Sequence, residues 1–180
     1  MGLFGLIKDA RNLIKEVKNS IKAYERYVSM SDEEVLALDD NEFYDAVYDR
    51  IGEKVDKADS FDILNKYQLA FFVLHEFVMD MQNGGLCQYL CNSSKERAEN
   101  LSYCLKMMGF EQTAELFNQF VFDNDIDFSM LDDEELDYEE FYESYDFDSF
   151  DEKFYEIYEN EPIYDTLVKF ARENYDTISE

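Results

Sequence analysis

Apolar residues recur along this chain at intervals of three and four, the spacing that places them on one face of an α-helix. The first such pattern covers residues 3–28, where steps of four and three alternate like the a and d positions of a heptad repeat. Later patterns predict helices over about residues 41–57, 61–82, 93–109, 111–122 and 149–158, and a last helix beginning near Pro162. No stretch shows the alternation of a half-buried strand. The pattern therefore predicts an all-α fold.

Short sequence signals agree with this prediction. Three sequences of the form Ser-x-x-Glu, at Ser31, Ser93 and Ser149, predict helix starts, because such a pair satisfies free backbone donors. One proline and six glycines leave few positions that interrupt a helix. A chain of 180 residues is long enough to bury one core. We predict a single compact multi-helix domain over residues 29–180, preceded by an amphipathic basic helix in residues 1–28.

Charge narrows the choice of function. The chain carries 16 Lys and Arg against 43 Asp and Glu, a formal net charge of −27. With 46% apolar and 17% aromatic residues, it still has the composition of a folded protein rather than of a disordered acidic tail. Binding to nucleic-acid phosphates requires Lys and Arg, so the balance argues against direct nucleic-acid binding. It argues equally against an anionic membrane as partner for the bulk of the chain.

The segment 3–28 differs in charge from the rest. It holds six basic and three acidic residues, whereas the remainder holds 10 and 40. Three roles stay open for it. The helix can fold onto its own acidic body, pair as a homodimer through residues 3–28, or lie on a membrane surface. Because no apolar run reaches the roughly 20 residues of a membrane-spanning helix, we expect no stable membrane insertion.

Residues that support catalysis are sparse. His75 is the one histidine in the sequence, and no nucleotide-binding or nucleophile motif occurs. The three cysteines, Cys87, Cys91 and Cys104, lack the spacing of a zinc site and suit the core of a cytoplasmic protein. The N-terminus lacks the pattern of a signal peptide. We expect no enzyme activity, no cofactor and no metal, although the many carboxylate pairs leave a hydrolase as an alternative.

One segment comes close to a calcium-binding loop. Asp123, Asp125, Asp127 and Glu134 occupy positions 1, 3, 5 and 12 of an EF-hand pattern. Position 6, where the sharp turn favours glycine, is Phe128. Alternating aspartates arise easily in so acidic a segment, so a solvated loop is the preferred interpretation.

The most informative segment is residues 123–152. It contains 15 carboxylates and seven aromatic residues and lies in a stretch without Lys or Arg. Mutual repulsion at this density opposes the compact state, which indicates that a function retains the charges. Carboxylates held by an aromatic base can imitate the field of DNA and attract a basic protein surface. The densest cluster, which we predict to contact the partner, comprises Asp132, Asp133, Glu134, Glu135, Asp137, Glu139 and Glu140.

Residues 80–92 carry a second signal, an acid followed by Asn-Gly-Gly, Gln-Tyr and Asn. The run resembles the signature of a bacterial, mostly helical family named after a DNA-mimic protein. Ala98–Gly109 and Phe150–Tyr155 are similar to further parts of that family, and the resemblance covers about residues 40–176. The motif residues in this chain are Asp80, Asn83, Gly84, Gly85, Gln88, Tyr89 and Asn92.

The chain departs from the family pattern at a few positions. Asp80 replaces a glutamate, Leu86 and Leu90 replace aromatic residues, and Lys95 stands where glycine is common. The heptad segment lies outside the resemblance. We expect the motif to be structural and to fix a helix–turn–helix junction, with Asn and Gly ending the helix over 61–82. A ligand pocket at the motif is the alternative.

The resemblance implies a helical acidic protein that occupies the DNA-binding surface of a transcription factor. Together with the charge, it makes a non-enzymatic protein-binding module the leading interpretation, with a basic DNA-binding protein as partner. An immunity protein that blocks a basic toxin such as a nuclease would use the same surface. A carboxylate-based or metal-dependent hydrolase is the alternative of a different class.

Overall fold

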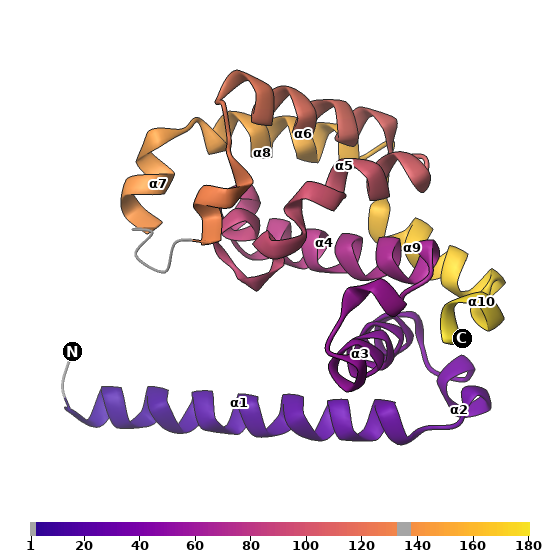
Figure 1. The fold of residues 1–180 in the computed structure, drawn as a ribbon. Helices are drawn as coiled ribbons and strands as arrows, with labels where there is room; N and C mark the ends of the chain where they lie inside the picture. Colours follow the sequence, from indigo (N-terminus) through magenta and orange to yellow (C-terminus); the bar gives the residue numbers. More distant parts are fainter. Residues whose placement is uncertain (1–2, 133–137) are drawn as a thin grey trace. The chain divides into compact units, whose positions relative to one another are not determined.

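The computed structural model describes the backbone of residues 3–132 and 138–180 (Figure 1). It describes their side chains as well, except those of residues 3–14, 16, 93, 130, 132 and 138. Within these ranges the chain forms helices joined by short loops and no strand, which confirms the predicted all-α class. None of the described helices combines the length and apolarity needed to cross a membrane.

The helices in chain order are α1 (Leu3–Ser29), α2 (Asp32–Leu36), α3 (Asp40–Ala58), α4 (Lys66–Cys91), α5 (Ala98–Met107), α6 (Glu111–Asp123), α7 (Tyr138–Ser144), α8 (Phe147–Tyr158), α9 (Ile163–Glu173) and α10 (Tyr175–Ser179). Three short 3-10 helices lie between them: η1 (Phe61–Ile63), η2 (Ser93–Arg97) and η3 (Phe128–Asp132). The positions of most helices match the apolar spacing, whereas α7 and α10 had no predicted counterpart.

Residue contacts divide the chain into two compact units, unit 1 (Met1–Ser60) and unit 2 (Phe61–Ile178). In unit 1 the buried Tyr27 anchors the C-terminal end of α1, which packs on α3. An ion pair of 2.6 Å between Arg26 Nη1 and Glu42 Oε1 joins the same two helices. The contacts thus group α1 with α2 and α3.

The predicted capping box at Ser31 is confirmed. The Ser31 N–H donates to Glu34 Oε2 at 2.8 Å, and the Glu34 N–H donates to Ser31 Oγ at 3.3 Å. The box begins α2, whose Val35 is fully buried. The helix starts predicted at the other two serines differ from the observed ones.

At Ser149 the helix start was predicted three residues too late. Asp146 is the N-cap of α8 and accepts a 3.2 Å hydrogen bond from the Ser149 N–H, so the serine is a donor inside the first turn. At Ser93 the chain forms η2 instead of an α-helix, and α5 begins at Ala98 without a side-chain cap. A carboxylate just upstream therefore caps α8 in place of the predicted serine.

α4 is the core helix of unit 2, as its apolar circumference predicted, with 16 of its residues buried. The predicted break at Asn83–Gly85, with a further short helix running to Asn92, is confirmed. Gly84 (φ −167°, ψ 20°) and Gly85 (φ 74°, ψ −166°) leave the helical conformation, and helix resumes at once and runs to Cys91. α4 thus consists of two helical segments that meet at a kink.

Aromatic rings attach the acidic C-terminal part of unit 2 to the core. Phe120 of α6 lies 5.3 Å from Phe147 and 5.4 Å from Phe150, both of α8. Phe141 of α7 lies 5.5 Å from Phe147, and Phe154 lies 5.4 Å from Phe77 of α4. Rings at these distances in edge-on and tilted arrangements contribute beyond their buried area. They hold α7 and α8 in place beneath their carboxylates.

Candidate protein-binding surface

The motif at residues 80–92 is built around one buried carboxylate. Asp80 is only 8% exposed. Its Oδ1 accepts hydrogen bonds from Gln88 Nε2 at 3.2 Å and from Asn92 Nδ2 at 2.6 Å. Its Oδ2 accepts from Ser94 Oγ at 2.5 Å. Three donors satisfy this buried charge, so Asp80, Gln88 and Asn92 fix the end of α4 and the start of η2.

The kink frees backbone groups of α4, and two residues of α8 satisfy them. The Leu86 N–H donates to Asp151 Oδ1 at 3.0 Å, and the Tyr155 hydroxyl donates to the Met81 carbonyl at 2.7 Å. Gly85 is required here, because its φ is positive and an added Cβ would overlap the Asp151 carboxylate. The predicted junction is thus a kinked helix held by a distant one.

The other motif residues divide between core and surface. Tyr89 is fully buried, and its ring meets Phe77 edge-on at 5.2 Å. Asn83 and Gly84 are exposed, and a Cβ on Gly84 would meet the side chain of Gln88. These contacts agree with the structural interpretation of the motif.

Several other carboxylates serve the fold. Glu76 and Arg97 form a bidentate ion pair. Arg97 Nε donates to Glu76 Oε2 at 2.7 Å, and Arg97 Nη2 donates to Glu76 Oε1 at 2.6 Å. Glu161 caps α6 by accepting from the N–H groups of Gln112 at 2.9 Å and Thr113 at 3.0 Å. Burial raises the pKa of Asp151 despite its bond from Leu86. These acids are engaged internally and leave the exposed ones for a partner.

The outer face of α8 carries a row of exposed acids. Its inner face buries Phe147, Phe150 and Phe154. The opposite face exposes carboxylates at spacings of four, four and three residues, which align along one side of a helix. These residues, here termed the α8 acidic stripe, are Asp148, Glu152, Glu156 and Glu159.

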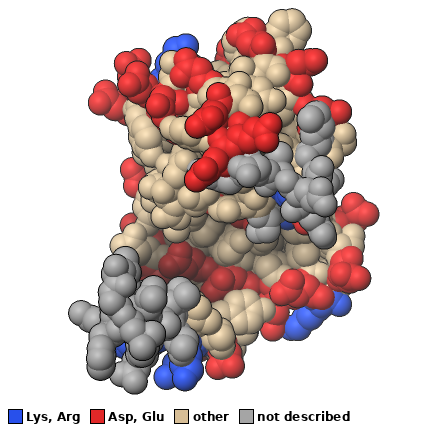
Figure 2. All heavy atoms as spheres, turned by 90° about the vertical axis from the view of Figure 1, so that its left-hand side faces the viewer, with Lys and Arg blue, Asp and Glu red and all other residues tan. Residues whose placement is uncertain are grey.

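α7 extends this charge on the neighbouring helix. Glu139, Glu140 and Glu143 are exposed on it. The Tyr142 hydroxyl donates to Asp148 Oδ1 at 2.7 Å, which links α7 to the α8 acidic stripe and raises the pKa of the tyrosine. Figure 2 looks onto the side that carries α7, and there Asp and Glu side chains gather with few Lys or Arg among them.

Only part of the predicted contact cluster can be located. Glu139 and Glu140 lie exposed on α7 as expected. Asp132 ends η3, and its side chain is not described. The remaining members, Asp133, Glu134, Glu135 and Asp137, lie outside the described residues.

The α8 acidic stripe was missed from the sequence, although its helical spacing could have revealed it. Charge density along the sequence indicates a different cluster, which lies upstream of α8. A search for acids repeating every three or four residues opposite the phenylalanines would have found the stripe.

Lys95 departs from the family pattern and has a role in this chain. Its ammonium group donates to the Leu131 carbonyl. The bond ties η2, beside the motif, to η3 at the entrance of the acidic segment. A glycine at this position would lack that link.

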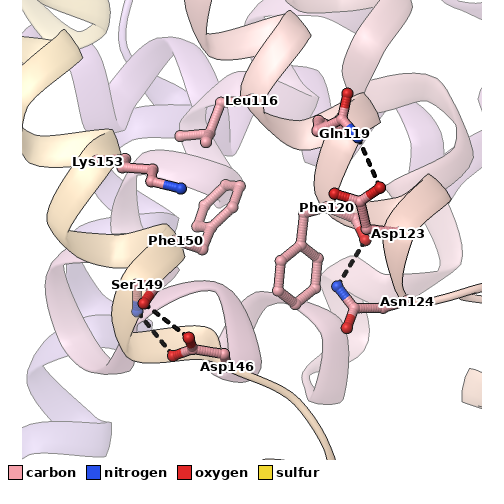
Figure 3. A pocket seen from close by; sticks show the side chains of 9 residues that line it. All are labelled: Leu116, Gln119, Phe120, Asp123, Asn124, Asp146, Ser149, Phe150 and Lys153. Carbon is pink, nitrogen blue, oxygen red and sulfur yellow. Dashed lines mark hydrogen bonds between the residues drawn. The ribbon is translucent and has the colours of Figure 1, made fainter.

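A pocket of about 200 Å³ lies between α6 and α8 (Figure 3). Asp123 accepts from Gln119 Nε2 at 2.6 Å, and Asp146 accepts from Ser149 Oγ at 2.7 Å. Each rim carboxylate is thus bound within its own element. The volume is below the roughly 300 Å³ at which small-molecule sites begin. The pocket therefore offers no clear substrate site.

The described residues give no support to the calcium loop. Asp127 Oδ1 accepts from the Ser129 N–H at 2.9 Å, and Asp123 is bound to Gln119. The loop's last predicted ligand, Glu134, lies outside the described residues. In the part of the chain that the structure describes, no three His, Cys, Asp or Glu side chains come together as metal ligands would.

Of the candidates for nucleophilic chemistry, His75, Cys87 and Cys104 are buried, and Cys91 is half-buried. His75 is 6% exposed, and its ring lies 6.4 Å from that of Phe71. Burial raises the pKa of Cys104 to about 12, which suppresses the reactive thiolate. A hydrogen bond with Cys87 raises the pKa of Cys91.

Comparison of the sequence with models of known families finds a match. A family model described as DMP19-like protein matches residues 62–174, more than half of the chain. The match begins with unit 2 and contains the kinked α4, the Asp80 network and the α8 acidic stripe. No curated protein and no solved structure is significantly similar to the chain.

Proposed function

This chain belongs to the DMP19-like protein family, and from that premise we propose that it is an acidic protein-binding module. In this proposal it is non-enzymatic and acts as a DNA mimic, occupying the DNA-binding surface of a basic protein such as a transcription factor. A nuclease would present a basic surface of the same kind. The observation that carries the proposal is the α8 acidic stripe with the neighbouring acids of α7.

The geometry of the stripe suits a basic groove. Four residues advance a helix by about 6 Å, so the stripe presents charges in a row at nearly constant intervals. DNA presents its charge along a rigid axis, at one charge per about 1.7 Å over both strands. The stripe is less dense, and the acids of α7 add to its field. A row of this kind attracts Lys and Arg side chains arranged for a phosphate backbone.

Rigidity also supports mimicry. Fixed charges bind a preformed surface without a large ordering cost, whereas the charges of a flexible tail must be ordered on binding. The phenylalanines of α8 lock its inner face against α4 and α6. Asp151 and Tyr155 tie the same helix to the α4 kink. The stripe is therefore presented on a helix that its core contacts hold.

The proposal places the module in the cytoplasm. Cys87, Cys91 and Cys104 form no disulfide bond among the described residues, and two of them are buried. Free thiols persist where glutathione keeps the environment reducing. A cytoplasmic location also gives access to transcription factors.

The test captures binding proteins from the native cytoplasm and asks whether double-stranded DNA releases them. The retained basic protein is then purified and titrated against the triple variant Glu152→Gln, Glu156→Gln and Glu159→Gln. We expect about tenfold weaker binding and a shallower dependence on salt, because three charges of the stripe are lost.

A matched control removes three exposed acids elsewhere in unit 2, through Glu99→Gln, Glu111→Gln and Glu115→Gln. The two variants have the same net charge. Equal losses of affinity would mean that net charge, not the stripe, drives binding. Failure of DNA to release the captured protein would contradict mimicry.

A further inference from the structure

We infer that the pocket between α6 and α8 receives an arginine side chain of the basic partner. The inference rests on the proposed function and names the group that the partner inserts. Two buried rings line the pocket, because Phe120 is 8% exposed and Phe150 is 2% exposed. Two exposed carboxylates, Asp123 and Asp146, lie at its rim (Figure 3). A guanidinium group presents a flat face to such rings and its N–H donors to such carboxylates.

The size of the pocket suits one long side chain. Its volume is about 200 Å³, which is below the range of small-molecule sites. Protein partners make smaller demands, because the side chains that dominate an interface enter pockets one at a time. Arginine is among the residues that most often do so. The volume that excludes a substrate therefore remains sufficient for a single residue of a partner.

The chain holds one of its own arginines with the same combination of groups. The guanidinium carbon of Arg97 lies 4.9 Å from the ring centre of Phe61 and 5.6 Å from that of Phe72. Its nitrogen atoms donate to the Glu76 carboxylate at 2.6 and 2.7 Å. Aromatic rings attract a cation over their faces, and the carboxylate pairs with its charge. The pocket between α6 and α8 offers both kinds of group to a partner.

The pocket borders the α8 acidic stripe. Ser149 and Lys153 line the pocket, and Glu152 and Glu156 follow each of them by three residues, which makes these pairs neighbours on the helix surface. A basic surface that lies along the stripe therefore reaches the rim of the pocket. Hydrogen bonds from Ser149, together with the charge of Lys153, lower the pKa of Asp146, so this carboxylate stays ionised at neutral pH.

The chemistry of the pocket favours arginine over lysine as the inserted residue. An ammonium group is compact and strongly hydrated, whereas a guanidinium group is weakly hydrated and stacks on aromatic faces. Lys153 is a cation of this chain at the same rim and competes with the incoming group for the two carboxylates. The partner's arginine must therefore bind in spite of Lys153, and removal of Lys153 should strengthen its binding.

The first test titrates the full chain with Nα-acetyl-arginine methylamide, a probe with one guanidinium group, and follows backbone amide signals by nuclear magnetic resonance. The signals of pocket residues such as Asn124 and Ser149 should shift and saturate, and the lysine analogue should bind at least threefold more weakly. Gln119→Trp narrows the pocket without a change in charge and should abolish this site. Gln112→Trp, the same substitution on α6 outside the pocket, should retain it.

Charge variants test the rim. Asp123→Asn with Asp146→Asn should weaken binding of the arginine probe about tenfold, and asparagine preserves the N-cap of α8. The control Glu99→Gln with Glu111→Gln removes the same net charge from exposed positions outside the pocket and should have little effect.

Lys153→Met should have the opposite effect and strengthen binding of the arginine probe about threefold. Lys106→Met removes an exposed lysine of α5 with the same change in net charge and should leave the affinity unchanged. Equal gains from the two lysine variants would mean that net charge attracts the probe, and would overturn the role of the rim.

Three results would overturn the pocket as an arginine site. They are equal binding of the arginine and lysine probes, shifts spread over exposed acids away from the pocket, and saturation that persists in Gln119→Trp. The purified basic partner supplies the second test, in which Gln119→Trp should lose about tenfold in affinity and Gln112→Trp should lose little.

The second test separates this inference from the proposed function. If the triple variant of the stripe weakens binding of the partner and Gln119→Trp does not, the proposed function stands and the inference is wrong. If no basic protein is captured, the proposed function fails, whereas saturation by the arginine probe would still establish a guanidinium site in the pocket.

Discussion

Individual residues of the motif act through backbone geometry more than through chemistry. Gly85 adopts a φ of 74°, which favours glycine, and the Asp151 carboxylate fills the space where a side chain would lie. Asp80 gathers three side-chain donors. The Asn-Gly-Gly sequence is thus explained by a bend in a helix and by the groups that hold the bend.

Gly85→Ala tests this explanation. We expect it to lower the free energy of unfolding by about 2–4 kcal/mol, because the positive φ is strained and the Asp151 hydrogen bond is displaced. Gly109→Ala is the control, since Gly109 also has a positive φ of 89° but nothing lies within 4 Å of an added Cβ. It should lose only about 1 kcal/mol. Urea denaturation measures both values, and equal losses would contradict the role of Asp151.

At the scale of helices, the sequence predicted those whose stability is local. Apolar spacing located α1, α3 and α6 to within a few residues, Pro162 marked the start of α9, and the capping box at Ser31 formed as expected. These elements are determined by residues close together in the chain.

The break at Asn83–Gly85 was predicted from local residues, but the contacts that hold the kink could not be. Its backbone groups are satisfied by Asp151 and Tyr155, and the first of these bonds spans 65 residues. Asn and Gly alone are equally consistent with a helix end. Similarly, Ser94 of η2 donates to Asp80, 14 residues earlier in the chain, and local spacing does not reveal this bond. Within the candidate surface, the density of acidic residues in the sequence pointed to Glu139 and Glu140. Finding the α8 acidic stripe required the helix boundaries.

Asp49 of α3, near α1, is an acid whose ionisation should make the stability of the fold depend on pH. Burial, together with the charge of Asp45, raises the pKa of Asp49 to about 6. A raised pKa means that the folded state binds the proton more tightly than the unfolded state. The resulting stability is present below about pH 4 and is lost as the pH rises through 6.

Asp49→Asn should therefore stabilise the protein at pH 7, by about 1–2 kcal/mol after allowance for solvent screening. At pH 4 the variant and the wild type should be nearly equal. Urea denaturation at both values measures the difference. Asp45→Asn removes only the neighbouring charge and should gain less. A variant that gains equally at both pH values would contradict the shifted titration.

At the scale of the whole molecule, net charge opposes folding. A charge of −27 on 180 residues repels itself, and screening should relieve the repulsion. We expect the melting temperature to rise by about 2–5 °C between roughly 20 and 500 mM sodium chloride. Differential scanning calorimetry measures this shift.

The triple Gln variant of the stripe supplies the comparison. With three charges removed it should melt at a higher temperature than the wild type in dilute buffer and respond less to salt. A lower melting temperature in dilute buffer would show that the stripe stabilises the fold. A contribution to stability would then explain why the chain keeps the stripe, without a binding partner.

α8 performs two tasks with different side chains. Asp151 and Tyr155 bind the kink of α4, and Asp148, Glu152, Glu156 and Glu159 form the acidic stripe. The two sets share no residue, so most of the stripe can change while the bonds to the kink are kept. A relative could therefore keep the same fold and bind a different partner after substitution of a few exposed residues. On this view the motif specifies the fold, and exposed residues outside the motif would determine which partner each protein binds.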